Sequence, residues 1–419
     1  MQRREFIKLL SASLPVFAAG CALSRIDPMS VFIRSDIIES PEQEQEIVSR
    51  AKLVWTDDKR VRVIYLRGTP YERGYQHGKL LREEINTNIG YLYQQALNKF
   101  RLEELFSEAY ERMSPFIPAA YLEEMHGLAH GSKMPLHVIH AIHALPEIGE
   151  WGGKRHIKQV VKRMMDGELG TNCSNFCLQK GATADGHTYT VRVLDWGLHR
   201  VSKLHKYPLI QVHVPDNGQA YANITWVGFI GAISGMNEEG ITLGEMGYGD
   251  PPGETMRGEP MPFMLRDVLA QAKNLKDVRQ IIQSSPGTNS YVFMMSDGKT
   301  SQAELYVRDR SRFLVFSPGQ AISDGKIQLP GIENILYGGH YQDKMIETLG
   351  ADRGKFTPQL LMDSVIPALA MPSNFQNVIY DAAERKFWVS NAKSPTERAA
   401  EQPYTYFDLK KGLAEFRAG

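Results

Sequence analysis

The chain changes its pattern of residues at about Gly170. From about Pro70 to Met165 apolar residues recur at helical spacings, whereas short runs rich in β-branched and aromatic residues follow, separated by turns. Two helical stretches, near 260–273 and 275–283, interrupt these runs. Helices followed by β-hairpins with an inserted helix pair predict an α+β fold in which sheets are flanked by helices.

A glycine pair marks the first helix. In "YERGYQHGKLL", Tyr71, Gly74, Gly78 and Leu81 recur every three or four residues and therefore share one helix face. Glycine costs about 1 kcal/mol relative to alanine inside a helix. Two glycines at this spacing predict that another element packs closely against that face.

The strands are expected in the second part of the chain. In "ADGH" at 184–187, Asp185 and Gly186 predict a hairpin turn. The runs that read as strands are "NFCLQKG", "HTYTVRVLDW", "LIQVHV", "QAYANITWVG", "GAISGM", "SYVFMMSD", "QAELYVRD", "RFLVFS", "NVIYDAAE" and "KFWVSNA".

The first 21 residues have the layout of an export signal. Arg3 and Arg4 belong to "RREFIK", which resembles the twin-arginine export signature, and a modest apolar stretch follows. "AAGC" at 18–21 resembles a lipobox, in which Cys21 is acylated and becomes the new N-terminus. An ordinary signal peptide with an incidental cysteine is the alternative. The sequence predicts an exported, periplasmic protein with a lipid anchor on Cys21, followed by a polar lead-in at 22–60.

Composition and motifs exclude several classes of function. Lys plus Arg and Asp plus Glu number 48 each, so no basic field for nucleic acid is expected. The sequence contains no GxSxG, GxxxxGK[ST] or HExxH motif. Its twelve histidines show no ligand spacing and there is no CxxC, so we expect neither a metal nor a cofactor.

Cys173 and Cys177 are the other two of the chain's three cysteines. If their segment is a strand, positions four apart are separated by about 13 Å, at roughly 3.3 Å per residue. A disulfide needs Cα atoms within about 7 Å. Two free thiols on one strand face are therefore expected, and Cys177 is interpreted as a buried, packed thiol.

The stretch that begins at Cys173, "CSNFCLQKGATADGHTYTVRVLDW", resembles the cysteine N-terminal nucleophile hydrolases, and among them the penicillin acyl-coenzyme A acyltransferase-like peptidase family. The resemblance rests on Cys173–Ser174, "ATADG" at 182–186, Arg192 and Asp195–Trp196, with Val193 where the family usually has Asn. Further similar segments in the family's order are "RGTPYERGYQHGKLL", "GMNEEGITL", "PMPFMLRDVLAQAKNLKDVRQII" and "NSYVFMMSDGKTSQAELY".

The resemblance implies a four-layer αββα sandwich with a self-cleaving nucleophile. Cys173 would be freed at a chain terminus, where its α-amine, with a pKa of about 7.7–8.0, can take the thiol proton. Arg192 would favour the thiolate, Asp195 would hold the α-ammonium, and Asn289 is the candidate oxyanion donor by resemblance, with a capping or turn role as its alternative. The expected division is a helical segment at 61–172 and a catalytic domain at 173–419.

The expected function is hydrolysis or transfer of an acyl group from a small amide or thioester. One alternative is an amidase of the conjugated bile salt, penicillin V or acyl-homoserine lactone kind. Another is a non-catalytic lipoprotein that binds an acylated ligand.

Overall fold

The computed structural model describes residues 38, 40–98, 103–150, 171–248, 254–339 and 341–418. All but residue 38 fall in one unit, Ser40–Gly419. The export signal expected at 1–21, with Cys21, lies outside the described residues.

A nine-stranded sheet forms one layer of the fold. Its neighbouring strands are antiparallel except for β2 and β5, which are parallel with Arg62 opposite Leu209. In spatial order the strands are β1 (Lys52–Trp55), β2 (Arg62–Gly68), β5 (Pro208–Pro215), β6 (Tyr221–Trp226), β7 (Ser234–Asn237), β8 (Ile241–Gly247), β9 (Tyr291–Asp297), β10 (Gln302–Arg308) and β11 (Phe313–Phe316).

A six-stranded antiparallel sheet forms the second layer, and it carries the cysteines. Both Cys173 and Cys177 lie on β3 and are free thiols, as expected from the strand geometry. In spatial order the strands are β14 (Ile335–Gly339), β3 (Thr171–Leu178), β4 (Tyr189–Trp196), β15 (Asn374–Asp381), β16 (Lys386–Asn391) and β17 (Thr405–Asp408). A small hairpin of β12 (Ile322–Ser323) and β13 (Gln328–Leu329) stands apart.

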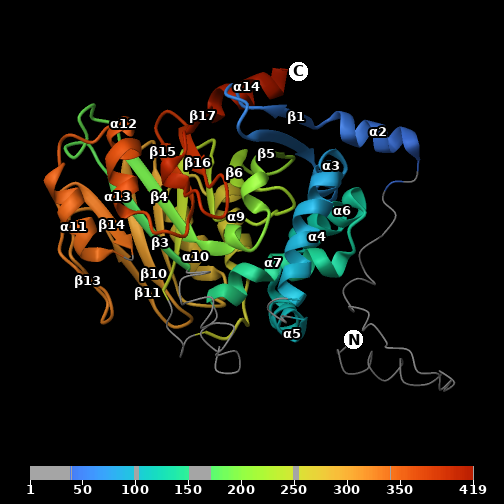
Figure 1. Cartoon of the computed structure of the whole chain (residues 1–419), viewed down its shortest axis with the longest axis horizontal. Helices are drawn as coiled ribbons and strands as arrows, with labels where there is room; N and C mark the ends of the chain where they lie inside the picture. The colour runs from blue at the N-terminus through green and yellow to red at the C-terminus, as the bar shows by residue number, and fades with distance from the viewer. Residues whose placement is uncertain are drawn as a thin grey trace. The chain divides into compact units, whose positions relative to one another are not determined.

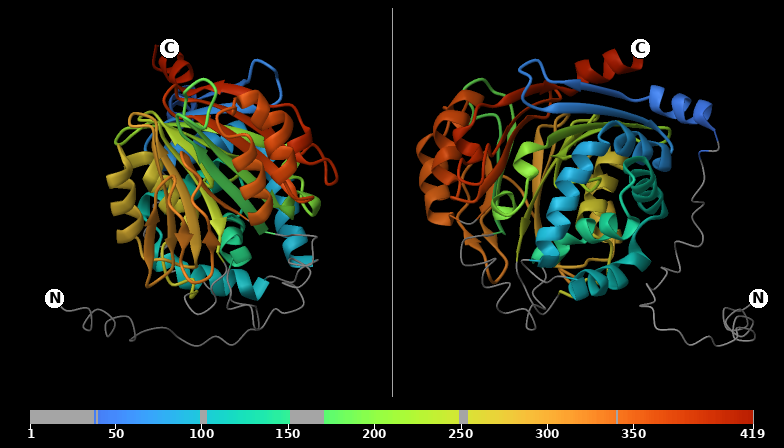
Figure 2. Two further views of the ribbon diagram at one scale, coloured as in Figure 1. Left: turned by 90° about the vertical axis from the view of Figure 1, so that its left-hand side faces the viewer. Right: turned by 45° about the vertical axis from the view of Figure 1, so that its right-hand side comes forward.

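The two sheets stack face to face between helices, which gives the expected αββα sandwich (Figures 1 and 2). Cys177 and Leu336 of the six-stranded sheet share one apolar core with Met294 and Leu305 of the nine-stranded sheet. The helices are α2 (Pro41–Ser49), α3 (Pro70–Leu80), α4 (Arg82–Asn98), α5 (Glu103–Met113), α6 (Ala119–Ser132), α7 (Leu136–Glu150), α9 (Met261–Gln271), α10 (Leu275–Ser284), α11 (Gln342–Ala351), α12 (Pro358–Leu360), α13 (Ile366–Leu369) and α14 (Leu409–Ala418).

Glycines bring α3 and α6 into close contact, as their spacing predicted. A Cβ at Gly74 would clash with the carbonyl oxygen of Glu124, and one at Gly78 would clash with that of Leu128. Gly127 and Gly131 play the same part on α6, where a Cβ would meet the backbone of α3. The helical layer is therefore built on backbone-to-backbone packing that only glycine permits.

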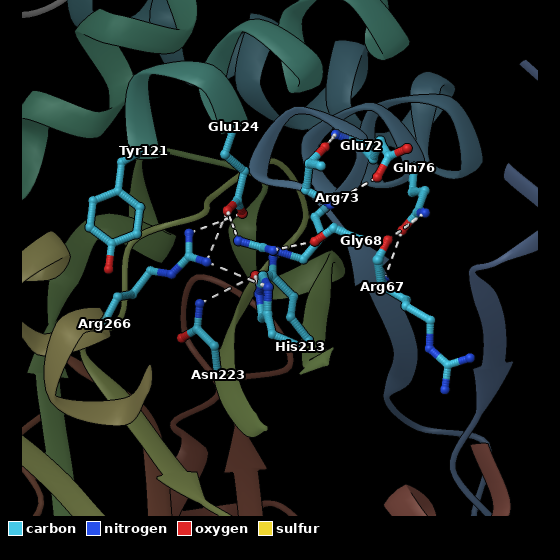
Figure 3. Close-up of polar contacts among 12 residues, drawn as sticks. Arg67, Gly68, Glu72, Arg73, Gln76, Tyr121, Glu124, His213, Asn223 and Arg266 are labelled. Atoms are coloured by element: carbon cyan, nitrogen blue, oxygen red, sulfur yellow. Dashed lines mark hydrogen bonds and ion pairs between the residues drawn. The ribbon is translucent and has the colours of Figure 1, made fainter. Parts of the chain in front are cut away.

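A buried ionic network joins this helical layer to the nine-stranded sheet and α9 (Figure 3). Arg266 of α9 donates from Nη1 and Nη2 to the two carboxylate oxygens of Glu124 on α6, at 2.9 and 3.0 Å. Arg73 of α3 lies 3.5 Å from the same carboxylate, and Tyr221 accepts from Arg266 Nε at 3.0 Å. The side chains of Glu124 and Arg266 are each 1 % exposed, so the pair is fully removed from water.

Two of the expected segment boundaries differ from the structure. Residues 22–60 do not act as a lead-in throughout, because 41–49 form α2 and β1 pairs in antiparallel fashion with β2. The segment 61–172 is not wholly helical, because β2 lies in the nine-stranded sheet beside β5. Strand pairing between distant parts of the chain, which local periodicity does not report, is the reason for the second difference.

Candidate active site

Cys173 lies near the start of β3, half-buried and close to Arg192. It stands opposite Leu194 on β4, and Arg192 stands opposite Asn175. Opposed residues of an antiparallel pair project from the same face, so the thiol and the guanidinium share one face. Arg192 Nη2 lies 3.9 Å from Cys173 Sγ. The structure thus brings together the expected nucleophile and the expected cation.

Arg192 is itself paired with a carboxylate that sequence reasoning missed. Its Nη2 donates to Oε2 of Glu245 on β8 at 3.0 Å, and both side chains are buried. Nε and Nη1 of Arg192 have no hydrogen-bond partner among the described residues. Glu245 is the one charged residue in the otherwise apolar strand "ITLGEMG". Because an ionised side chain is rarely buried without a partner, this feature could have indicated a buried ion pair.

The thiol of Cys173 is neutral at ordinary pH in the uncleaved chain. Burial raises the pKa of Cys173, and the carboxylates of Glu245, Asp195 and Glu150 raise it further, against the lowering effect of Arg192. Proton removal by a nearby base is therefore required before the sulfur can act as a nucleophile.

Asp195 lies on the opposite face of β4 from Arg192, facing the backbone that precedes the nucleophile. Its cross-strand partner is Asn172. Oδ1 accepts from Met371 N at 3.1 Å and from Asn374 Nδ2 at 3.0 Å. Oδ2 is buried and has no hydrogen-bond partner within the described part of the chain. Burial raises the pKa of Asp195 to about 7, so this carboxylate can accept a further donor.

Asn289 is buried just before β9 and is held by α7. Its Nδ2 donates to the backbone oxygen of Glu147 at 3.0 Å and to Glu147 Oε2 at 2.7 Å. The same carboxylate accepts from Tyr291 OH at 3.0 Å, and burial raises the pKa of Glu147 to about 7. The structure does not place Asn289 with Cys173, so its role as an oxyanion donor stays a prediction that requires release from Glu147.

A cavity of about 30 Å³, partly open to solvent, adjoins Cys173. Its walls are mainly apolar, and they come from α7, from β4, from the segment before β7 and from the start of α9. The lining residues besides Cys173 are Pro146, Gly149, Glu150, Leu194, Trp196, Ile233, Glu245 and Met261. An apolar lining with a thiol and the carboxyl groups of Glu150 and Glu245 suits an acyl group rather than a polyanion.

Cys177 lies deeper on the same strand and does not belong to the cavity lining. Its side chain is fully buried, and Thr190 Oγ1 donates to its sulfur at 3.6 Å. Burial raises the pKa of Cys177 to about 12. The interpretation of Cys177 as a packed thiol is confirmed.

Over the described ranges, no group of three or more His, Cys, Asp or Glu side chains could hold a metal ion. No helix in those ranges is long and apolar enough to cross a bilayer.

Comparison with known proteins gives a family match over part of the chain. Protein dcd1B of Dictyostelium discoideum is 23 % identical over 369 residues, which cover 80 % of this chain and 69 % of that protein. The N-acylethanolamine-hydrolyzing acid amidase ortholog of Caenorhabditis elegans gives a TM-score of 0.37 at 13 % identity, covering 50 % of this chain and 93 % of that one. Penicillin V acylase from Agrobacterium tumefaciens gives 0.36 at 13 %, covering 57 % and 87 %.

The family match covers residues that supply part of the cavity lining, namely Leu194, Trp196, Ile233, Glu245 and Met261. The model of the acyl-coenzyme A:6-aminopenicillanic acid acyl-transferase family matches residues 183–321, which include Arg192, Asp195, Glu245 and Asn289. Over residues 183–321 the comparison therefore bears out the resemblance drawn from the sequence, and this region of the α+β sandwich matches the acyl-coenzyme A:6-aminopenicillanic acid acyl-transferase family.

Proposed function

We propose that this chain is an autoproteolytically activated cysteine hydrolase or acyltransferase that acts on a small acyl amide or thioester. The observation that carries the proposal is the half-buried thiol of Cys173 in an apolar cavity, 3.9 Å from a buried guanidinium. The family match over residues 183–321 supports acyl chemistry on amides. We assign Cys173 as nucleophile, Arg192 as the cation that favours the thiolate, Asp195 as the partner of the α-ammonium and Asn289 as an oxyanion donor.

Maturation would begin at the peptide bond between Asn172 and Cys173. The sulfur adds to the Asn172 carbonyl carbon, its proton passes to the Cys173 nitrogen, and the C–N bond breaks to leave a thioester. Water then hydrolyses the thioester, giving the Asn172 carboxylate and a free Cys173 amine and thiol. The cross-strand place of Asp195 opposite Asn172 supports this step, because its unpartnered Oδ2 can receive the new ammonium.

Turnover would use the amine that maturation releases. The amine takes the thiol proton, the thiolate attacks the acyl carbon, and the leaving amine or thiol departs with that proton. The acyl-enzyme thioester is then cleaved by water, or by an acceptor in a transfer reaction. Because burial raises the pKa of the Cys173 thiol, a base at bonding distance is needed, and the α-amine meets that need.

Intact mass measurement tests the proposal directly. Residues 173–419 are 247 of the 419 residues of a 47.3 kDa chain, so cleavage should give a heavy chain of about 28 kDa that begins at Cys173. Cys173→Ala should stay a single, inactive chain. Cys177→Ala is the matched control and should cleave normally. An uncleaved wild type whose Cys173 resists alkylation, or failure of Cys177→Ala alone, would overturn the assignment in favour of a binding protein.

We propose in addition that the protein is exported by the twin-arginine route and anchored in the periplasm through acylated Cys21. The support is "RREFIK" and "AAGC" in the first 21 residues. Arg3→Lys with Arg4→Lys should leave precursor in the cytoplasm, and Cys21→Ser should release active enzyme from the membrane fraction. Unchanged export of the double variant, or a fully soluble wild type, would contradict the respective part.

A further inference from the structure

The segment between β6 and β7, residues 227–233 and here called the β6–β7 loop, forms one wall of the Cys173 cavity through Ile233. Three side chains of the helical layer bind its backbone. Asn88 Nδ2 donates to Val227 O at 2.8 Å, Gly228 N donates to His77 Nε2 at 3.1 Å, and Ile230 N donates to His143 Nε2 at 2.9 Å. Two histidines from different helices thus act as acceptors for one loop.

Both imidazoles are buried and neutral. His143 Nδ1 lies 2.7 Å from Ile139 O, so Nδ1 carries the proton and Nε2 is the acceptor that meets Ile230 N. His77 is 1 % exposed and His143 6 % exposed. Burial lowers the pKa of His77 to about 3 and that of His143 to about 4. The two contacts therefore persist across the ordinary pH range.

The other side of the loop is fixed by the second half of the chain. Gln211 Nε2 donates to Phe229 O at 2.6 Å, and Ala232 N donates to Pro262 O at 2.9 Å. Gly228 has φ of +93°, and a Cβ there would clash with Ile89. The loop has little freedom to move while these contacts hold. Removing one histidine contact weakens its attachment to the helices and leaves its contacts with Gln211 and Pro262 in place.

His143 also connects two walls of the cavity. It lies on α7 one turn before Pro146, and Pro146 and Gly149 line the cavity on one side while Ile233 lines it from the loop. The hydrogen bond to Ile230 N therefore ties α7 to the loop that carries the second wall. Loss of this hydrogen bond would change the space next to the thiol without altering Cys173 or Arg192.

We propose that His143, supported by His77, is a positioning residue that fixes the separation of the α7 wall and the β6–β7 loop wall and thereby determines which acyl groups fit beside Cys173. The specificity part rests on the proposed function, because it treats this cavity as the acyl site. The loop-positioning part does not depend on catalysis.

The test compares three substitutions on α7 in the full chain. His143→Leu removes the acceptor, whereas His143→Gln can place an amide oxygen near the former Nε2. His140→Leu is the matched control. His140 is similarly buried on the same helix, but it stacks on Tyr110 and makes no hydrogen bond with the loop among the described residues. Hydrogen exchange of the 227–233 amides is measured beside a series of straight-chain acyl p-nitroanilides and the iodoacetamide reaction of Cys173.

We expect His143→Leu to accelerate exchange of the loop amides by about tenfold, which corresponds to one lost buried hydrogen bond of about 1.4 kcal/mol. KM should rise for the preferred acyl length and the length preference should broaden, while the alkylation rate of Cys173 stays near that of wild type. His143→Gln should restore both readouts, and His140→Leu should match wild type.

The outcomes test loop positioning, acyl specificity and the proposed function separately. Unchanged loop exchange in His143→Leu would overturn the inference, whatever the activity. Faster exchange with an unchanged acyl preference would overturn the specificity role. If the wild type shows no acyl chemistry at Cys173, the proposed function fails, yet the exchange comparison still decides whether His143 positions the loop.

Discussion

Nη2 of Arg192 lies 3.0 Å from Oε2 of Glu245 and also approaches Cys173 Sγ at 3.9 Å. The same guanidinium nitrogen therefore faces the carboxyl group of Glu245, whose pKa is raised by burial, and a sulfur that can become a thiolate. Glu245 reduces the stabilisation that Arg192 can give to a thiolate, and it raises the pKa of Cys173. At the same time it compensates a guanidinium that would otherwise be buried without a counter-charge.

Glu245→Gln should make Cys173 more reactive at neutral pH. The amide keeps an oxygen for Arg192 but removes the charge that raises the thiol pKa, and a fall of one pKa unit would speed alkylation about tenfold. The rate with iodoacetamide is measured against pH in a Cys177→Ala background. Glu304→Gln, at another buried glutamate, is the control. A slower or unchanged rate would show that Glu245 acts mainly by holding Arg192 in place.

Asn289→Ala should lower kcat by about 10²–10³ with little change in KM if Asn289 donates to an oxyanion. The amide is bonded to Glu147 in this structure, so Glu147→Gln, which keeps an acceptor, should retain most of the activity. Steady-state kinetics of the cleaved enzyme check both variants. If kcat of Asn289→Ala falls by less than about tenfold, Asn289 serves only to hold α7 through Glu147.

The stabilising contribution of Asp195 to the uncleaved Cys173→Ala chain should be lost as pH rises from about 4 to 7. The folded-state pKa of Asp195 is raised to about 7, so in that range the folded state binds more protons than the unfolded state, and one such group changes the free energy of unfolding by up to about 1.4 kcal/mol per pH unit. Above pH 7 the contribution is constant. The difference between the profiles with and without Asp195→Asn isolates this slope. Glu147 adds a slope of the same sign, whereas His77 and His143, whose pKa values are lowered by burial, add slopes of the opposite sign.

Urea unfolding between pH 4.5 and 8 measures these profiles. In the cleaved wild type, an α-ammonium beside Asp195 would hold the carboxyl ionised, and this slope should disappear. A steep profile that Asp195→Asn leaves unchanged would contradict the account of Asp195.

Local sequence predicted those elements whose formation depends on neighbours along the chain. β3 and β4 form the expected hairpin, and Asp185 and Gly186 lie in its connection, residues 179–188, rather than in a tight turn directly between the strands. Gly186 has φ of +78°, and His187 N donates to Asp185 Oδ1 at 3.0 Å. The spacing of Gly74 and Gly78 predicted a close helix contact because each glycine removes a Cβ from the same face. In these cases the cause lies within a few residues.

Pairings across long separations could not be predicted in this way. Glu245 is 53 residues from Arg192, and Glu147 is 142 residues from Asn289. Each member of these pairs reads locally as a polar residue in a strand or helix, and only the stacking of sheets and helices brings the partners together. The parallel pairing of β2 with β5 is a similar case, since it joins residues from either side of the expected boundary at 172.

Gly74→Ala should destabilise the protein although alanine is the better helix former. The new Cβ would clash with the Glu124 carbonyl, which is backbone and cannot rotate away. Gly90→Ala on α4 is the control, because its Cβ would meet only the end of the Met134 side chain at 3.9 Å. That variant should gain about 0.5–1 kcal/mol from the lower entropy of the unfolded chain. Urea unfolding midpoints decide the comparison, and equal gains in both variants would contradict the close packing.

Glu124→Gln should cost more stability than Arg266→Met. The first leaves Arg266 and Arg73 buried without their shared carboxylate, whereas the second leaves Glu124 with Arg73 still 3.5 Å away. Breaking a buried ion pair costs about 3–5 kcal/mol, whereas an exposed pair contributes roughly 0–1 kcal/mol. Arg417→Met, which removes the exposed pair with Glu238, is therefore the matched control and should change little. Because Glu124 and Arg266 lie on either side of the proposed cleavage site, the same variants should release the N-terminal fragment that ends at Asn172 from the heavy chain at lower urea concentrations. Retention of both chains at the wild-type concentration, with unfolding midpoints like that of Arg417→Met, would show that apolar packing alone holds them together.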